Sequence, residues 1–241
     1  MGRKIALLLV GLCLSLSVLA GETAGRVDAR HYHAFWLWSG VHLPPALPNV
    51  QDVYLHQGEV LVRQGRAVLV PAGLPVTRLR IPRLWITLRL ETIDISDALI
   101  DGMIRQVSRW RRAGNQVVGL QIDFDAATRR LSDYGDFLQR VRARLPAGMA
   151  LGVTGLLDWA QTGSVAQLNR LPVDELVVQT YQGRTTVAGY DRYLSALSGL
   201  QIPFRVGIVQ GGEWSDAAEK ALSTSPWFTG MVVFVVKKPD R

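Results

Sequence analysis

The sequence predicts an irregular (β/α)8 barrel of the TIM type. Segments with strand character alternate with segments of helical periodicity along most of the chain, and such alternation produces parallel βαβ units. Counting the main strands gives eight, the number that closes a barrel of this class. No Gly-rich phosphate loop follows any strand, so the alternative of an open doubly wound sheet lacks support.

The first half of the chain supplies four of the eight strands. Pro44, Pro45 and Pro48 forbid a helix directly after the first of them. The clearest helix begins at the N-cap Ser96, continues with apolar residues at helical spacing and ends at Gly114. Because the first two connections lack helical periodicity and little chain follows the last strand, we expect helices 1, 2 and 8 to be short or missing. The four expected strands are 33–41, 53–63 with a hairpin return over 67–70, 85–92 and 117–125.

The second half of the chain repeats the alternation. An amphipathic helix that carries Tyr134 and Val141 on its apolar face ends before Pro146. The helices beyond it are shorter, and we expect Ser164 to cap the first of them. The expected strands are 149–157, 175–180, 204–209 and 231–236, and the helices between them are 164–171, 190–197 and 215–222.

The first twenty residues stand apart from the rest. Arg3 and Lys4 precede an apolar run over 5–19. Val18 and Ala20 are small residues at the positions that a signal peptidase reads, so we expect cleavage after Ala20 and a periplasmic or secreted bacterial protein without stable membrane insertion. An uncleaved anchor is the alternative, although the run is slightly short for a span of about 20 apolar residues. The predicted divisions are a signal peptide over 1–20, a flexible N-terminal segment over 21–30 and a single barrel domain over 31–241.

The composition argues against several classes of function. The only cysteine, Cys13, lies in the leader, so the mature chain would contain neither a disulfide nor a thiol nucleophile. The formal charge is +7, but the arginines are scattered among helix faces without interleaved aromatic residues, so we expect no nucleic-acid partner. His31 and His33 lack a third ligand at a suitable spacing, so we expect no metal site and no cofactor. The sequence leaves the oligomeric state open.

The segment 117–125 carries the clearest chemical signal. Side chains on a strand alternate between two faces, and here one face is apolar. Gly119, Gln121, Asp123 and Asp125 share the other face. A strand buried on both sides would be apolar throughout, so this polar row must meet solvent, a partner or a substrate. We interpret it as the floor of an active site; the alternative is a half-exposed strand end whose two aspartates cap the following loop.

Catalytic residues of such barrels project from the C-terminal ends of the strands and from the loops behind them. The residues at these positions combine carboxylates, amides and indoles, which suits a carbohydrate because aromatic faces stack on sugar rings while amides and acids bind hydroxyls. Plainer roles compete: Trp36 and Trp38 could fill the barrel core, and Glu91 could form an ion pair with Arg89 on its own strand. The candidates are Asp123, Asp125 and Tyr181 for catalysis, and Trp36, Trp38, Glu91, Gln121, Asp158, Trp159, Gln179, Gln182, Glu213 and Trp214 for substrate binding.

Four short motifs carry a resemblance to a known family. They are His-Ala-Phe-Trp-Leu-Trp at 33–38, Tyr-Leu-His-Gln-Gly-Glu at 54–59, Gln-Ile-Asp-Phe-Asp at 121–125 and Gln-Thr-Tyr-Gln at 179–182. With these motifs the whole mature chain resembles the bacterial domain-of-unknown-function family 3142. That family is grouped with TIM-barrel glycosidases and has no established activity, so the resemblance implies a fold and a broad class only.

A more distant resemblance is to the chitinase-like glycosidases. Their fourth strand carries an Asp-x-Asp-x-Glu run and their sixth carries Met-x-Tyr-Asp; Asp123, Asp125 and Tyr181 match parts of these patterns. The chain departs from them at Ala127, where that family has its acidic Glu, and at Gln182, where an Asp would follow the tyrosine. These departures put a chitinase mechanism in doubt.

The sequence therefore predicts an exported glycoside-hydrolase-like protein that acts on an envelope or secreted polysaccharide. Hydrolysis needs one carboxylic acid to protonate the leaving oxygen and a second carboxylate, and Asp123 and Asp125 on one strand face would lie roughly 7 Å apart. Our hypothesis takes Asp125, nearer the mouth, as the proton donor and Asp123 as the group that orients it or stabilises charge. Two alternatives are a barrel that binds glycan without cleaving it and an envelope assembly factor with a protein partner.

Overall fold

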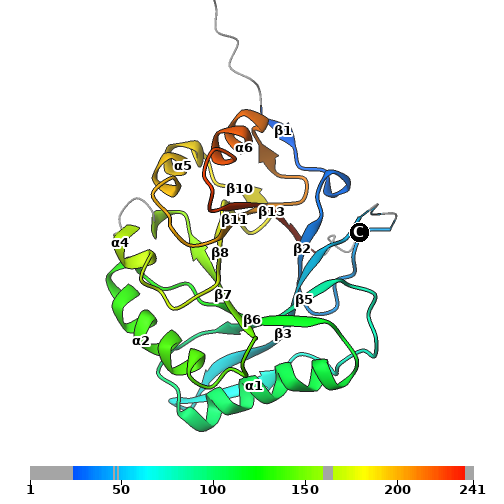
Figure 1. The fold of residues 1–241 in the computed structure, drawn as a ribbon, viewed down its shortest axis with the longest axis vertical. Helices are drawn as coiled ribbons and strands as arrows, with labels where there is room; N and C mark the ends of the chain where they lie inside the picture. The colour runs from blue at the N-terminus through cyan, green and yellow to red at the C-terminus, as the bar shows by residue number, and fades with distance from the viewer. Residues whose placement is uncertain (1–23, 46, 48, 160–164, 237–241) are drawn as a thin grey trace, which may run out of the picture.

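The fold is a closed barrel of eight parallel strands (Figure 1). The computed structural model describes residues 24–45, 47, 49–159 and 165–236. Each barrel strand pairs in parallel with the next along the chain, and the last strand pairs with the first, so the (β/α)8 prediction is confirmed. The barrel strands are β2 (Ala34–Leu37), β3 (Asp52–Arg63), β5 (Arg83–Leu90), β6 (Val117–Asp123), β7 (Ala150–Leu156), β8 (Glu175–Gln179), β11 (Phe204–Val209) and β13 (Phe228–Val235).

The helices lie outside the ring of strands, mainly around its second half (Figure 1). In the described part of the chain, the connections from β2 to β3 and from β3 to β5 contain no α-helix, as the sequence predicts. The second connection instead begins with β4 (Arg66–Pro71), which returns antiparallel along β3 as the expected hairpin. No helix among the described residues is both long and apolar enough to cross a membrane. The helices are α1 (Asp97–Arg112), α2 (Leu131–Arg142), α4 (Val165–Leu168), α5 (Asp191–Leu197), α6 (Asp216–Leu222) and the 3-10 turns η1 (Ala29–His31) and η2 (Thr128–Arg130).

Helix α1 begins and ends as its sequence predicts. The Ser96 hydroxyl accepts a hydrogen bond from the Leu99 backbone N–H at 3.3 Å, which caps the first turn. At the other end, Gly114 has φ +85°, a left-handed conformation that glycine adopts without strain. The expected cap of α4, Ser164, lies outside the described residues, and so do the predicted signal peptide and its cleavage site.

The described part of the predicted flexible segment, residues 24–30, is bound to the barrel domain. Strand β1 (Gly25–Arg26) pairs antiparallel with β12 (Glu213–Trp214), and Val27 and Ala29 are buried. Residues 24–30 are therefore packed against the barrel domain. The composition of this segment is mainly polar, but Val27 and Ala29 pack against the apolar core, and the backbone of β1 forms hydrogen bonds with β12.

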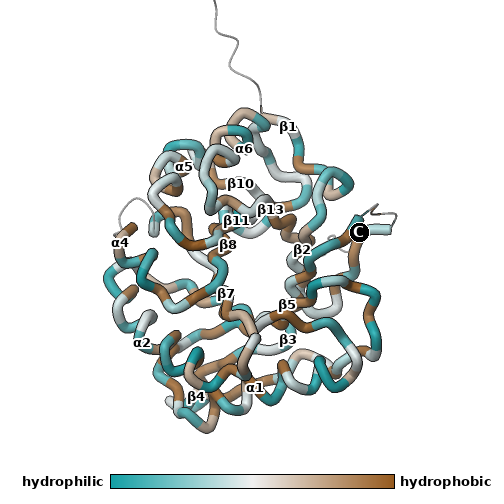
Figure 2. The backbone as a smooth tube through the Cα atoms, in the orientation of Figure 1, coloured by the Kyte–Doolittle hydropathy of each residue, from teal (hydrophilic) through white to brown (hydrophobic). Residues whose placement is uncertain are grey.

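Two apolar layers hold the barrel together. One lies between the strands and the surrounding helices, and the other fills the lower barrel interior. Trp85 and Trp36 are the largest side chains of this interior filling. Trp85 fits only because glycines face it: a Cβ on Gly119 would approach its ring to 2.4 Å and one on Gly152 to 3.1 Å. Figure 2 shows apolar strands inside a more polar outer surface.

Charged residues close the N-terminal end of the barrel. The Arg205 guanidinium of β11 lies 3.0 Å from the Glu175 carboxylate of β8 and 3.1 Å from the Asp52 carboxylate of β3. Tyr54 donates a hydrogen bond to Glu175, and Arg83 lies 2.7 Å from Asp52. Burial raises the pKa of Glu175, and the Arg205 charge opposes that shift. Three strands that are distant in sequence are thus joined through one buried cation.

Replacing Arg205 by Met should lower the free energy of unfolding by about 3–5 kcal/mol, because Asp52 and Glu175 would stay buried without their shared cation. Urea denaturation at neutral pH measures this change. Arg83→Met is the matched control: the Arg83 side chain is 51% exposed, and its loss should cost at most about 1 kcal/mol. Equal losses in the two variants would contradict the role given to Arg205.

Candidate active site

A cavity of about 780 Å³ opens at the C-terminal end of the barrel. Its walls come from the ends of β2, β5, β6, β7, β8 and β13 and from the loops behind them. This cavity, called the mouth cavity below, contains all three predicted catalytic residues and four of the ten predicted binding residues. Its lining residues are Trp38, Arg89, Asp123, Asp125, Leu156, Leu157, Asp158, Gln179, Tyr181, Gln182, Gly183, Val187, Tyr193 and Phe234.

Asp123 lies at the floor of the mouth cavity. It is only 2% exposed, and its carboxylate accepts a hydrogen bond from the Thr154 hydroxyl at 2.6 Å. The Arg89 guanidinium lies 3.4 Å from its other oxygen. Burial raises the pKa of Asp123, while the hydrogen bond from Thr154 and the charge of Arg89 lower it and the nearby Asp125 carboxylate raises it further. Asp123 is thus a buried carboxyl group with an increased tendency to hold a proton.

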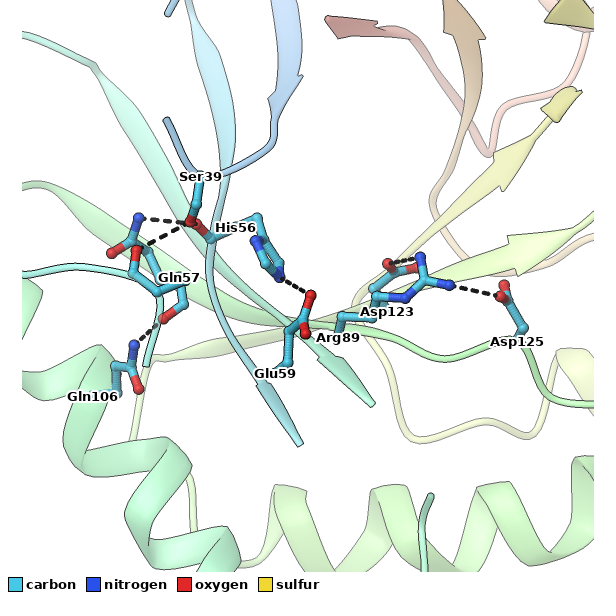
Figure 3. Close-up of polar contacts among 9 residues, drawn as sticks. Ser39, His56, Gln57, Glu59, Arg89, Gln106, Asp123 and Asp125 are labelled. Carbon is cyan, nitrogen blue, oxygen red and sulfur yellow. Dashed lines mark hydrogen bonds and ion pairs between the residues drawn. The ribbon is translucent and has the colours of Figure 1, made fainter. Parts of the chain in front are cut away.

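Asp125 lies above Asp123 and reaches solvent. Its side chain is 53% exposed, and one carboxylate oxygen lies 3.3 Å from the Arg89 guanidinium, so this one cation bridges both aspartates (Figure 3). The guanidinium also lies over the Trp38 ring, 5.7 Å from its centroid. The aspartates are therefore paired with an arginine, yet a cavity remains open above them.

Tyr181 forms part of the cavity wall behind the aspartates. Its ring packs on Phe234, with centroids 4.8 Å apart. Burial raises the pKa of the Tyr181 hydroxyl well above its usual value, and the charge of Asp123 adds to the shift. The hydroxyl therefore stays protonated and is available as a hydrogen-bond donor. Gln179, Gln182 and Asp158, three predicted binding residues, line the same cavity.

Two predicted binding residues lie deeper, inside the barrel. Trp36 is fully buried; it stacks on Phe234 and donates a hydrogen bond from its indole N–H to the Gln121 side-chain oxygen at 2.9 Å. Gln121 also accepts from the Thr87 hydroxyl at 3.0 Å and has no exposed surface. Both side chains point into the barrel, as the sequence predicts. However, other residues cover them, so neither lines the mouth cavity.

Two predicted tryptophans lie outside the mouth cavity. Trp159 is buried between the barrel and α2, where its indole N–H donates to the Ala126 carbonyl at 2.8 Å. Trp214 is buried on the other side of the barrel and stacks on Tyr190 at 4.9 Å. Each follows a strand end, as the sequence suggests, but each points away from the barrel axis into packed apolar surroundings.

The two predicted glutamates are also absent from the mouth cavity. Glu91 accepts a hydrogen bond from the Val62 backbone N–H at 2.7 Å at the β3–β4 hairpin. The expected ion pair between Glu91 and Arg89 is wrong, because Arg89 points to Asp123 and Asp125 instead. Glu213 is exposed on β12, where its backbone bonds to the Thr186 hydroxyl.

Sequence reasoning missed several cavity residues. Arg89 is the most important of them, and its position as the penultimate residue of β5 could have placed it at the mouth. Phe234 has the same signal on the last strand. Tyr193 and Val187 come from the loop and helix after β8, whose course a strand pattern does not reveal. Within the described ranges, no cluster of three or more His, Cys, Asp or Glu side chains is arranged to hold a metal ion.

Comparison with known proteins confirms the family resemblance. Residues 81–192 match the family described as "Domain of unknown function (DUF3142)". This stretch includes β5 to β8 and therefore Arg89, both aspartates and Tyr181. No curated protein matches the chain.

Three solved structures are similar to the chain. The first is the chitinase domain of the spore coat protein CotE from Clostridium difficile, with 12% identity over 73% of this chain and a TM-score of 0.46. The second is the spore cortex-lytic enzyme SleL of Bacillus cereus, with 16% identity over 73% of this chain and a TM-score of 0.41. The third comprises the CBM22-1 and GH10 modules of the Clostridium thermocellum endo-1,4-beta-D-xylanase 10B complexed with xylohexaose, with 11% identity over 89% of this chain and a TM-score of 0.47. The matches cover 65%, 50% and 62% of the respective structures, so this chain spans less than two thirds of each.

Replacing Asp123 by Asn should make stability less dependent on pH. The folded protein holds the Asp123 proton more tightly than the unfolded chain, because burial raises this pKa. The contribution of Asp123 to stability is therefore largest at low pH and declines as the pH rises from about 3.9, the ordinary carboxyl pKa, through the raised value. The free energy of unfolding of the variant, relative to wild type, should increase with pH across this window.

Denaturation series at several pH values measure this difference. Asp133→Asn is the matched control, since the Asp133 side chain is 62% exposed on α2 and its substitution should give a nearly constant difference. A constant or falling difference for Asp123→Asn would contradict the assignment.

Proposed function

We propose that the protein is an exported glycoside hydrolase that binds an envelope or secreted polysaccharide in the mouth cavity and cleaves it with two carboxyl groups, Asp123 at the end of β6 and Asp125 in the loop after it. One observation carries the proposal: Asp123, Asp125 and Tyr181 line a single open cavity together with the indole of Trp38. Hydrolysis of a glycosidic bond requires two carboxyl groups in different protonation states, and the surroundings of the two aspartates differ in the way that this requires.

The cavity suits a sugar chain in shape and chemistry. Trp38 and Tyr181 offer flat apolar surfaces on which a sugar ring can stack. Gln179 and Gln182 present amides, which both donate to and accept from hydroxyl groups. Asp158 adds a third carboxylate at the rim. This mixture of aromatic and polar groups is typical of carbohydrate sites.

The electrostatics favour Asp123 as the proton donor. Asp123 is buried and its pKa is raised, whereas Asp125 reaches solvent and lies against a guanidinium that stabilises its charge. In the proposed step the Asp123 carboxyl proton passes to the glycosidic oxygen as the bond from that oxygen to the sugar carbon breaks. The Asp125 carboxylate stabilises the positive charge on that carbon. Water then supplies the hydroxyl group that replaces the leaving sugar, and its remaining proton returns to the Asp123 carboxylate. This assignment reverses the roles hypothesised from the sequence.

The proposal that the protein is exported rests on the amino-acid sequence alone. The basic residues, apolar run and small residues within positions 1–20 have the order of a signal peptide. The substrate would then be a polysaccharide of the cell envelope or one released outside the cell.

A second candidate function is glycan binding without cleavage. Arg89 lies against both aspartates, and its charge lowers the pKa of Asp123 against the effect of burial, which opposes proton donation by this group. In addition, Ala127 at the start of η2 supplies no carboxylate where chitinase-like enzymes carry their acid. Such a protein would hold a saccharide in the same cavity, with the aspartates and Arg89 serving as hydrogen-bonding groups.

Asp123→Asn and Asp125→Asn should each lower kcat on a glycan substrate roughly 10²–10⁴-fold, the usual contribution of a catalytic acid or base. The measurement is release of reducing ends from a panel of neutral, amino and acidic polysaccharides, followed by kinetics on the best substrate. Asp133→Asn, a surface carboxylate on α2, should leave kcat unchanged. Binding of a glycan with no release of reducing ends by the wild-type protein would favour the second candidate function.

The two carboxyl roles can be separated with an aryl glycoside whose leaving group needs no protonation. Asp123→Asn should then recover most of its lost activity, because the acid is no longer required, whereas Asp125→Asn should remain impaired. Recovery by Asp125→Asn alone would restore the roles expected from the sequence.

A further inference from the structure

A second cavity, of about 480 Å³, lies beside the mouth cavity, on the side of β3 and β4. Trp38 lines both cavities and is their shared wall. Apolar side chains of Val41, Val70 and Pro71 form part of the second cavity, and His56 and Glu59 provide its ionisable groups. The proposed catalytic mechanism uses neither of these two side chains.

His56 is buried without hydrogen-bond partners. Its side chain is 5% exposed, and neither ring nitrogen has bonding geometry with any described residue. The Glu59 carboxylate lies 3.7 Å from Nε2, which is longer than a hydrogen bond (Figure 3). Leaving a buried polar group unpaired costs about 1–3 kcal/mol, so an imidazole in this state needs a reason.

The backbone holds His56 in place through an irregularity of β3. The register between β3 and β5 shifts between His56 and Gly58, which marks a β-bulge, and bulges redirect side chains near active sites. Gly58 is required there, since a Cβ would lie 2.9 Å from the Val70 carbonyl oxygen. The Ser39 hydroxyl donates to the His56 carbonyl at 2.6 Å, and Gln106 of α1 donates to the Gln57 carbonyl (Figure 3). The position is therefore rigidly built.

We propose that the second cavity is a subsite for a further, neutral sugar unit of the saccharide chain whose reacting unit lies in the mouth cavity. The sugar ring would pack on Trp38 and the apolar wall, and its hydroxyl groups would bond to the His56 ring and the Glu59 carboxylate. A neutral unit is preferred over an acidic one because Glu59 repels anions and the nearby Arg89 is already paired with Asp123 and Asp125. This inference rests on the proposed function and specifies the length of chain that is recognised.

The test is binding of neutral oligosaccharides of increasing length to the folded, full barrel domain. The probes are cello-, xylo- and chito-oligosaccharides from one to four units, measured by calorimetry. Wild type should bind the longer members of at least one series about tenfold more tightly than the shortest member that binds. His56→Leu and Glu59→Gln should each remove most of that gain while leaving affinity for the shortest member unchanged.

A matched control and a stability measurement separate this role from a structural one. His33→Leu changes a histidine exposed at the opposite end of the barrel and should leave the length dependence intact. His56→Leu should unfold no more easily than wild type, because the imidazole it removes has no hydrogen bond to lose. In wild type, the ring nitrogen signals of His56 in nuclear magnetic resonance spectra should shift with the longer oligomers only.

The outcomes distinguish the subsite from the catalytic proposal. An unchanged length dependence in both His56→Leu and Glu59→Gln would overturn the subsite and leave the mouth cavity as the whole site. Length-dependent binding that these variants abolish, without hydrolysis, would support the subsite while rejecting catalysis. Failure of all three series to bind would overturn the subsite as defined here for neutral sugars, and hydrolysis of other glycans would still test catalysis.

Discussion

The Arg205 guanidinium holds two buried carboxylates, Asp52 and Glu175, at the N-terminal end of the barrel, and the rest of the structure depends on this arrangement. It joins β3, β8 and β11, so the ring can close in one register only if these strand starts meet. Buried charges are costly unless each is paired, and here every charge of the network has a partner. The N-terminal end of the barrel is thus closed by this side-chain ion network and by the Trp85 ring above it. The cavity lies at the other, C-terminal end.

The two ends of the barrel contain the same groups in different surroundings. At the N-terminal end, the Arg205 side chain is 14% exposed and its two carboxylate partners are buried. At the C-terminal end, Arg89 is 41% exposed and also bridges two carboxylates, but with open space above them. Water or a ligand can therefore reach the Arg89–Asp125 pair, in which both side chains are exposed, more readily than the pairs that Arg205 forms. This difference, rather than residue type, separates a stabilising ion network from a site for chemistry.

The sequence predicted which way side chains point better than it predicted how deeply they are buried. Strand alternation correctly placed Asp123 on the inward face, because a period of two follows from backbone geometry alone, and the rule that site residues follow strand ends placed Asp125 and Tyr181 at the same mouth. It could not say that Trp36 would be covered or that Trp159 would turn into the helix layer, since both outcomes depend on packing against distant segments. Arg89 was paired with its neighbour Glu91, whereas its partners are 34 and 36 residues away. A local sequence pattern cannot predict ion pairs between residues on different strands.

Three departures from local rules lie around the mouth and its neighbouring cavity. The bulge at His56 breaks the strand period, Asp123 keeps a carboxyl group buried, and the ring nitrogens of His56 have no partners. Each feature costs stability, and none closes or supports the barrel, a task that the Arg205 network and Trp85 perform at the other end. Natural sequences tolerate such conflicts mainly where function requires them. Asp123 lies in the mouth cavity and His56 in the second cavity, and Trp38 lines both. The unusual surroundings of these two side chains therefore support a site that extends from the mouth cavity across the Trp38 indole into the second cavity.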